Sequence, residues 1–280
     1  MSGYNILSIA GSDPSGGAGI QADLKTFSAL GGYGMTVVTA LTAQSTRGVT
    51  GVHPVPAAFV ADQLDTLLTD ARVDAVKIGM LADTGVIAAV AAAIDRYALG
   101  NVVLDPVMVA KSGDRLLAAD AVAAVRTELM PRADLVTPNL PEAAELLAED
   151  EAADLEAMAA QADRLLRLGA RHVLLKGGHL GGSASERCTD LLAAPGREPR
   201  TFTAERVPTS NTHGTGCTLS SAIAALLPQR DGVAAAVRDA KAYLTAALRH
   251  ADVLDAGTGK GPVHHFHAWW GPASDRPLPR

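Results

Sequence analysis

The sequence of 280 residues has only two cysteines, Cys188 and Cys217, and no long uninterrupted apolar run. Two thiols so far apart in the chain do not form a disulfide framework, which favours a reducing, cytoplasmic location. A membrane-spanning helix would need about 18 consecutive apolar residues, so no membrane span is expected. No basic leader precedes the first apolar segment, so we also expect no signal peptide.

Clusters of lysine and arginine are absent as well. The chain has 24 lysines and arginines against 30 aspartates and glutamates, a formal net charge of -6. Nucleic-acid interfaces usually show a basic patch, so a nucleic-acid partner is not expected. Hydrophobic residues make up 48% and charged residues 19%, as in soluble globular proteins. The length and the absence of repeats or linkers predict one domain over residues 1–280, with an irregular tail from about residue 255.

Six short segments are almost continuously apolar, which is typical of parallel strands buried on both faces. They span 5–10, 35–41, 73–78, 101–104, 133–136 and 172–175. Amphipathic helical periodicity lies between them, most clearly over 60–71, 155–166 and 233–244. The alternation predicts an α/β fold with a mostly parallel sheet. Residues 186–207 break the pattern and predict an antiparallel hairpin at one edge of this sheet.

Small and polar residues follow each predicted strand. Ligands bind beyond the carboxyl ends of the strands in an open parallel sheet. The residues concerned are Gly11, Gln44, Met80, Asp105, Asn139 with Glu142, and Lys176. Each one alone is explained equally well by an ordinary polar turn. Their accumulation at one edge predicts a ligand site there.

The segment HGTGCT at 213–218 places Gly214, Thr215, Gly216 and Cys217 at the start of an apolar helix. Unpaired amides and the helix dipole make such a terminus a candidate phosphate site, and a plain glycine turn is the alternative. The chain contains no GxxxxGK[ST] motif, and the loop GSDPSGGAG at 11–19 lacks GxGxxG. The segment GTGKG at 257–261 has the wrong spacing and no preceding strand, so we expect an ordinary loop.

Several segments together resemble the hydroxymethylpyrimidine/phosphomethylpyrimidine kinases of thiamine biosynthesis, in the ribokinase-like superfamily. They are AGSDPSGGAGIQADLKTF at 10–27, TALTAQ at 39–44, KIGML at 77–81, VLDPVMVAKSG at 103–113, TPNLPEA at 137–143, LLKGGH at 174–179 and HGTGCT at 213–218. The similarity extends from about residue 6 to residue 270. It implies a three-layer sandwich with a nine- or ten-stranded sheet, ATP as the donor, and two transfers. The first goes to a hydroxymethyl group and the second to the resulting monophosphate. Family habit also suggests a homodimer.

The resemblance assigns the catalytic position to Cys217, where related sugar kinases carry an aspartate. A thiol pKa near 8.5 is lowered at a helix N-terminus, so we expect Cys217 to accept a proton near neutral pH. A small residue packed under the loop is the alternative. Gln44 carries a donor and an acceptor that match an aminopyrimidine edge, and the family's pyrimidine contact also maps there. An exposed loop glutamine is the alternative.

The resemblance also places Gly11, Asp23, Met80 and Val107 around the substrate. Asp23 is expected to accept a hydrogen bond from the hydroxymethyl group, or otherwise only to favour its helix dipole. Met80 and Val107 are expected to form an apolar slot, although either fits an ordinary core. Residues 106–117 are expected to form a flap that keeps water from the phosphoryl group.

The nucleotide end of the site is expected to contain a metal and a cation. Asp105 and Glu142 are candidate Mg²⁺ ligands, with contact through water. Lys176 is expected to contact the transferring phosphate, with Asn139 beside it and Gly214, Thr215 and Gly216 around the phosphates. Surface roles are the alternative for each of them.

Other functions stay open from the sequence. A pyridoxal or pyridoxine kinase shares the fold and an aromatic hydroxymethyl substrate. A non-catalytic module that binds a pyrimidine or nucleotide is a second alternative, and a hydrolase that pairs Cys217 with His213 is a third. The segment HHFH at 264–267 fits no usual zinc spacing and is expected to pack on the domain.

Overall fold

The computed structural model describes residues 3–108, 119–178, 180 and 185–271. Within these residues, eight strands form one sheet in the order β10-β9-β8-β7-β6-β5-β1-β2, and β3 and β4 form a separate two-stranded ribbon. The strands are β1 (Tyr4–Ala10), β2 (Gly32–Val38), β3 (Ala40–Ser45), β4 (Gly48–Pro54), β5 (Ala75–Ile78), β6 (Val102–Leu104), β7 (Leu135–Val136), β8 (Val173–Gly177), β9 (Arg187–Ala193) and β10 (Arg200–Glu205). Neighbours from β2 to β8 are parallel, and β9 and β10 are antiparallel at the edge, as predicted.

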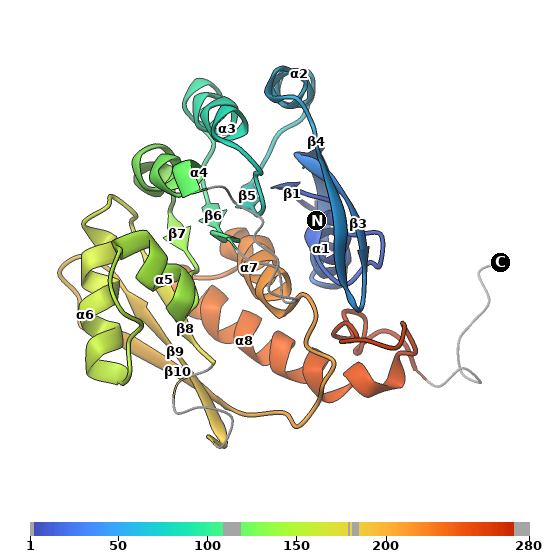
Figure 1. Cartoon of the computed structure of the whole chain (residues 1–280), viewed down its shortest axis with the longest axis vertical. Helices are drawn as coiled ribbons and strands as arrows, with labels where there is room; N and C mark the ends of the chain where they lie inside the picture. The colour runs from blue at the N-terminus through green and yellow to red at the C-terminus, as the bar shows by residue number, and fades with distance from the viewer. Residues whose placement is uncertain (1–2, 109–118, 179, 181–184, 272–280) are drawn as a thin grey trace.

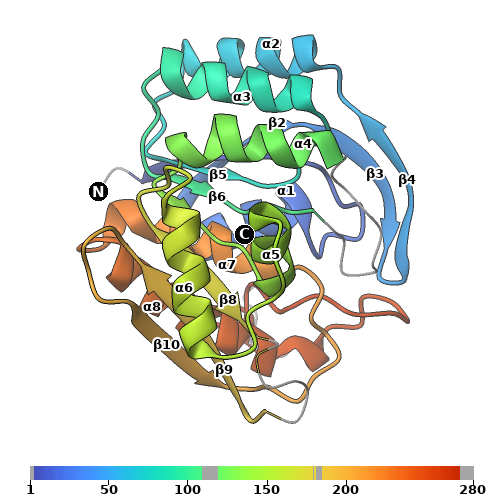
Figure 2. The same ribbon diagram turned by 60° about the vertical axis from the view of Figure 1, so that its left-hand side comes forward.

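Helices cover both faces of the sheet, so the predicted three-layer, ribokinase-like α/β architecture is confirmed (Figure 1). The helices are α1 (Gly19–Ala29), α2 (Ala57–Leu68), α3 (Thr84–Arg96), α4 (Ala119–Ala124), α5 (Leu140–Leu147), α6 (Leu155–Leu166), α7 (Thr215–Leu226) and α8 (Val233–Arg249). Shorter turns are η1 (Val125–Leu129), η2 (Met130–Arg132), η3 (Leu227–Gln229) and η4 (Ala251–Val253). Figure 2 shows α2, α3, α4 and α6 on the near face of the sheet, with α7 and α8 behind. No helix among the described residues is both long and apolar enough to cross a membrane.

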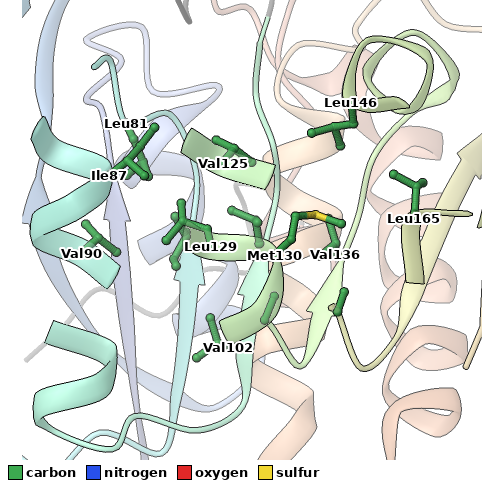
Figure 3. Close-up of a cluster of buried hydrophobic side chains, with 14 of the residues drawn as sticks. Leu81, Ile87, Val90, Val102, Val125, Leu129, Met130, Val136, Leu146 and Leu165 are labelled. Carbon is green, nitrogen blue, oxygen red and sulfur yellow. The ribbon is translucent and has the colours of Figure 1, made fainter. Parts of the chain in front are cut away.

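The protein has two hydrophobic cores, one on each face of the sheet, because the strands are apolar on both faces. Successive side chains of a strand point to opposite faces. Leu7 and Ile9 of β1 therefore pack toward the layer of α2 to α6, whereas Ile6 packs with α1, α7 and α8. The larger core continues across the sheet in Figure 3, which labels Leu81, Ile87, Val90, Val102, Val125, Leu129, Met130, Val136, Leu146 and Leu165. Burial on both faces is the reason that these strands read as unbroken apolar runs.

One predicted strand was only partly correct, because β2 covers residues 35–38 but not 39–41. The apolar run 35–41 is divided, because β2 ends at Val38 and β3 begins at Ala40 in the other sheet. Thr39 lies at the break, where its amide donates to the Ala10 carbonyl (3.0 Å) and its hydroxyl to the Met80 carbonyl (2.6 Å). Gln44 therefore lies on the ribbon and does not follow a strand of the main sheet. The expected nine or ten strands appear as eight plus two within the described residues.

The C-terminal segment supports the ribbon and the domain. The loop at 257–261 holds the turn of the ribbon, with the Lys260 amide donating to the Thr46 carbonyl (2.9 Å) and the Arg47 guanidinium to Thr258 Oγ1. A lone two-stranded ribbon is marginally stable, so this contact matters. His265 is buried, with Nε2 3.1 Å from Thr218 Oγ1. Burial is the main reason that the pKa of His265 is lowered to about 3. The segment 264–267 thus packs on the domain, as predicted.

Candidate active site

The two glycine loops identified in the sequence pack directly against each other. Gly214 has a φ of 77°, and a Cβ there would collide with the Gly17 carbonyl. A Cβ on Gly17 would in turn collide with the ring of His213. A left-handed φ strains residues other than glycine, so Gly214 meets both a conformational and a steric requirement. Glycine in these loops thus allows the N-termini of α1 and α7 to approach closely.

The first turn of α7 lies beside a buried ion pair. A Cβ on Gly216 would be 3.6 Å from both Asp105 Oδ2 and Lys176 Nζ. Across the described residues, no acceptor faces the amides of Gly216 or Cys217. Unpaired amides at a helix N-terminus attract anions, and a cation next to them strengthens that attraction. This corner therefore has the chemistry of a phosphate site at Gly216 and Cys217, whereas the Thr215 amide donates to the Thr212 carbonyl (3.5 Å).

Lys176, on β8, forms ion pairs with Asp105, which follows β6, and with Glu142, on α5. Its Nζ lies 3.0 Å from Asp105 Oδ1 and 3.8 Å from Glu142 Oε2. Burial by itself would lower the pKa of Lys176, but the two carboxylates raise it well above its usual range. Burial similarly opposes ionisation of Asp105, while Lys176 and Lys77 hold the pKa of Asp105 below its usual value. The pair is therefore charged at neutral pH.

Asn139 and Glu142 lie at the start of α5 and form a capping box. The Glu142 amide donates to Asn139 Oδ1 (2.8 Å), and the Asn139 amide donates to Glu142 Oε2 (2.8 Å). Asn139 also bridges Lys176 through the backbone, so it lies beside the lysine as predicted. Burial and the nearby Asp105 raise the pKa of Glu142 to about 7, against the opposing effect of Lys176. Among the described residues, no group of three histidines, cysteines and carboxylates could hold a metal.

Asp23 lies below this corner in a closed network. Lys77 Nζ is 2.9 Å from both of its carboxylate oxygens, and the hydroxyls of Ser8 and Ser221 each donate to it at 2.6 Å. Asp23 and Lys77 are fully buried. Four hydrogen bonds leave the carboxylate little capacity for a substrate hydroxyl, so the geometry argues against the contact expected for Asp23. The sequence reasoning missed Lys77, although a lysine inside a buried strand was a visible signal.

Cys217 has a thiol that is harder to ionise than the sequence suggested. Its side chain is partly exposed, yet the surrounding protein removes enough water to raise its pKa to about 11. Asp23 and Asp105 raise the pKa further, while Lys77 and the Gly19 amide lower it. The expected lowering at the helix N-terminus was therefore wrong, because burial and two carboxylates outweigh the positive groups.

Three other predicted substrate residues, Gly11, Met80 and Val107, follow the ends of β1, β5 and β6. A Cβ on Gly11 would be 3.4 Å from Met80 Sδ, so these two residues are neighbours. Val107 is partly buried and its amide donates to the Asp105 carbonyl (2.8 Å). Residues 109–117 of the expected flap lie outside the described residues.

Gln44 faces Asp13 and His213, a pairing that the sequence analysis had not predicted. His213 Nε2 lies 2.8 Å from Asp13 Oδ2 and 3.5 Å from Gln44 Nε2. The described ring contacts of His213 include Asp13 and Ser15 but not Cys217. The geometry therefore lacks the thiol–imidazole pair that a hydrolase would need.

Comparison with known proteins gives consistent results. The family model for phosphomethylpyrimidine kinase matches residues 13–264. The hydroxymethylpyrimidine/phosphomethylpyrimidine kinase of Escherichia coli (strain K12) is 56% identical over 270 residues, which are 96% of this chain and 100% of that protein. An ADP complex of Bacillus subtilis pyridoxal kinase has a TM-score of 0.86 and 37% identity, covering 95% of this chain and 99% of the other. Phosphomethylpyrimidine kinase from Clostridium difficile 630 has a TM-score of 0.77 and 39% identity, covering 88% and 99%.

Proposed function

Because the chain belongs to the phosphomethylpyrimidine kinase family, it is a kinase, and we propose that it phosphorylates 4-amino-5-hydroxymethyl-2-methylpyrimidine to the monophosphate and then to the diphosphate. ATP is the proposed donor, and thiamine biosynthesis is the pathway that the relatives' names support. The observation that carries the proposal is the meeting of the free α7 amides with Lys176 and Asp105 at Gly216. Membership of a kinase family argues against the alternative of a non-catalytic binding module.

The proposed transfer depends mainly on position and charge. Phosphoryl transfer passes through a loose transition state, so catalysis comes from aligning the groups and neutralising charge. Lys176 is proposed to contact the transferring group as a point charge, together with the unpaired amides of Gly216 and Cys217. Gly11, Met80, Val107 and Gln44 are proposed to hold the pyrimidine ring. Asp23 is proposed to be a positioning residue and not a substrate contact, because its buried carboxylate pairs with Lys77.

Magnesium fits the donor chemistry of the nucleotide end. Asp105 and Glu142 are hard oxygen donors brought together around Lys176, and Mg²⁺ is usually bound by one or two carboxylates plus waters and phosphates. We propose that these two residues hold Mg²⁺ through water. When bound, the ion supplies positive charge toward the phosphates.

The test is a coupled ADP-release assay on the full chain with four acceptors. We expect turnover with the hydroxymethylpyrimidine and with its monophosphate, and little with pyridoxal or ribose. Pyridoxal is the informative rival, because pyridoxal kinases share the fold at high structural similarity. Turnover of pyridoxal without turnover of either pyrimidine would contradict the proposed function.

Cys217→Ser is expected to slow the hydroxymethyl step by about tenfold or more and the monophosphate step much less. A phosphate acceptor has a second pKa of about 6 and needs little help from a base, whereas an alcohol does. The thiol pKa of about 11 gives the sign of the pH effect. The thiolate fraction rises up to about tenfold per pH unit below that pKa, so the wild-type hydroxymethyl rate should rise from about pH 7 to about pH 9.

The same pH series on Cys217→Ser provides the control. We expect its hydroxymethyl rate to be flatter with pH than that of the wild type. Equal losses on the two acceptors, or identical pH profiles for the two proteins, would remove Cys217 as the proton acceptor.

We also propose one domain, a cytoplasmic location and a homodimer. The continuous sheet from β10 to β2 supports one domain. Large exposed apolar side chains on the edge strand β2 and on the ribbon support self-association: Tyr33, Leu41 and Val52. Sedimentation equilibrium of the purified chain tests the dimer, and a monomer at micromolar concentration would contradict it.

A further inference from the structure

A chain of polar contacts runs from the first glycine loop to Gln44, and the phosphoryl-transfer proposal does not use it. Asp13 Oδ2 lies 2.8 Å from His213 Nε2, which lies 3.5 Å from Gln44 Nε2. Gln44 Oε1 is 3.1 Å from Thr42 Oγ1, and Thr42 Oγ1 is 2.8 Å from the Ser12 carbonyl. Both ends of the Gln44 amide therefore have a polar neighbour.

The proton on His213 follows from its partner. Asp13 is almost fully buried, and its carboxylate accepts hydrogen bonds from the Ser15 amide (2.9 Å), the Ser15 hydroxyl (2.7 Å) and the Ala18 amide (2.8 Å). Burial opposes ionisation, but these bonds and His213 lower the pKa of Asp13 to about 2. An ionised carboxylate only accepts, so His213 Nε2 carries a hydrogen whether the ring is neutral or charged.

The proton on Thr42 follows in the same way. A threonine hydroxyl has one hydrogen to donate and can accept as well. The Ser12 carbonyl can only accept and is the nearer partner, at 2.8 Å against 3.1 Å for Gln44. Thr42 therefore donates to Ser12, and its oxygen is left to accept a hydrogen bond from Gln44.

We propose that Asp13, His213 and Thr42 are positioning residues that fix the orientation of the Gln44 amide. The nitrogen and oxygen of an amide have the same shape, so the protons on the neighbours decide which end is which. In the proposed orientation the Gln44 NH₂ donates to Thr42 Oγ1, and the Gln44 carbonyl oxygen takes the end that lies 3.5 Å from His213 Nε2, whose hydrogen is donated mainly to Asp13 at 2.8 Å. The opposite orientation would leave the Gln44 NH₂ facing a protonated nitrogen that cannot accept a hydrogen bond.

This orientation determines what the substrate meets, and this step rests on the proposed function. One N–H and one lone pair of Gln44 remain after its protein contacts. A 4-aminopyrimidine offers an amino donor and a ring-nitrogen acceptor that match them. Hydroxymethylpyridines such as pyridoxal carry no ring amino group, so the amino donor that would meet the Gln44 oxygen is missing. A site built to hydrogen-bond a group discriminates strongly against an analogue that lacks it.

The main test compares His213→Gln with His213→Leu. Both variants lose the ring, but the glutamine nitrogen is as many bonds from Cα as His213 Nε2 and keeps a donor toward Asp13 and Gln44. We expect His213→Leu to raise KM for the hydroxymethylpyrimidine about threefold, because the 3.5 Å contact with Gln44 is a weak one, with KM for ATP unchanged. His213→Gln should retain most of the affinity. Equal KM values for the two variants would overturn the proposal, because a purely packing role does not distinguish them.

A double-mutant cycle with Gln44→Leu tests whether His213 acts through Gln44. If it does, His213→Leu adds no further increase in KM once Gln44 is leucine. Both single variants should also lower the preference for the pyrimidine over pyridoxal. Additive increases in KM would overturn the proposal. If the wild type fails to phosphorylate the pyrimidine, the proposed function itself is wrong, so the two failures are distinguishable.

Thr42 allows a pair of test substitutions that do not disturb the interior, because this residue lies on the ribbon and is partly exposed. We expect Thr42→Val to raise KM for the pyrimidine about threefold to tenfold, since the Gln44 NH₂ loses its acceptor. Thr42→Ser keeps the hydroxyl and should behave like the wild type. If His213→Leu does not fold, the two Thr42 variants test the proposal instead. Equal KM values for Thr42→Val and Thr42→Ser would contradict the proposed orientation of the Gln44 amide.

Discussion

Replacing Lys77 with methionine is expected to lower the free energy of unfolding by about 3–5 kcal/mol, the cost of leaving one buried charge without its partner. Lys77 and Asp23 are fully buried, and Lys77 Nζ is 2.9 Å from both carboxylate oxygens. Without the ammonium, Asp23 keeps only the hydroxyls of Ser8 and Ser221. Urea unfolding of the two proteins measures the difference.

An exposed ion pair supplies the matched control. Arg96 and Asp65 form a bond of similar length (3.0 Å), but their side chains are 65% and 46% exposed. Solvent screens such pairs, so Arg96→Met should change stability little. If Lys77→Met were as mild as Arg96→Met, the buried pair would not have the structural weight given to it here.

The Lys77 variant also links stability to chemistry. Lys77 is the leading group that lowers the pKa of Cys217 against the effect of burial. In Lys77→Met the thiol should therefore ionise at still higher pH, and the hydroxymethyl step at about pH 8 should slow more than the monophosphate step. Equal slowing of both steps would point to general damage to the site.

Local patterns predicted most of the main sheet, because burial on both faces makes a parallel strand apolar throughout. The same pattern failed at Thr39. The apolar run continues through this residue, but the chain changes sheets there, and the bonds that turn it come from Ala10 and Met80. Strand β4 was missed because its exposed residues carry no apolar alternation. Contacts distant in sequence decide both features, and no local pattern displays them.

The site shows the same division. The rule that ligands gather at strand ends correctly brought Asp105, Asn139 and Lys176 together. The pairs Asp23–Lys77 and Asp13–His213 were missed, since their members are 54 and 200 residues apart. The thiol pKa of Cys217 was wrong for a related reason. A helix N-terminus is visible in the sequence, but the burial and the carboxylates that oppose it are not.

The most direct test of the phosphate site proposed at the first turn of α7 is Gly216→Ala. A Cβ there would sit 3.6 Å from Asp105 Oδ2 and Lys176 Nζ, an ordinary contact, and alanine favours a helix. The fold should therefore be kept, with a melting temperature like that of the wild type. The methyl group would occupy the space proposed for the transferring phosphoryl group, and a misplacement of about 1 Å can cost about a hundredfold in rate.

The measurement is kcat for ADP release with the hydroxymethylpyrimidine and with its monophosphate, alongside Gly100→Ala, where a Cβ would meet open space. The account predicts that Gly216→Ala loses about a hundredfold in kcat on both acceptors while Gly100→Ala loses little. A folded Gly216→Ala protein with wild-type kcat on both acceptors would show that phosphoryl transfer occurs elsewhere.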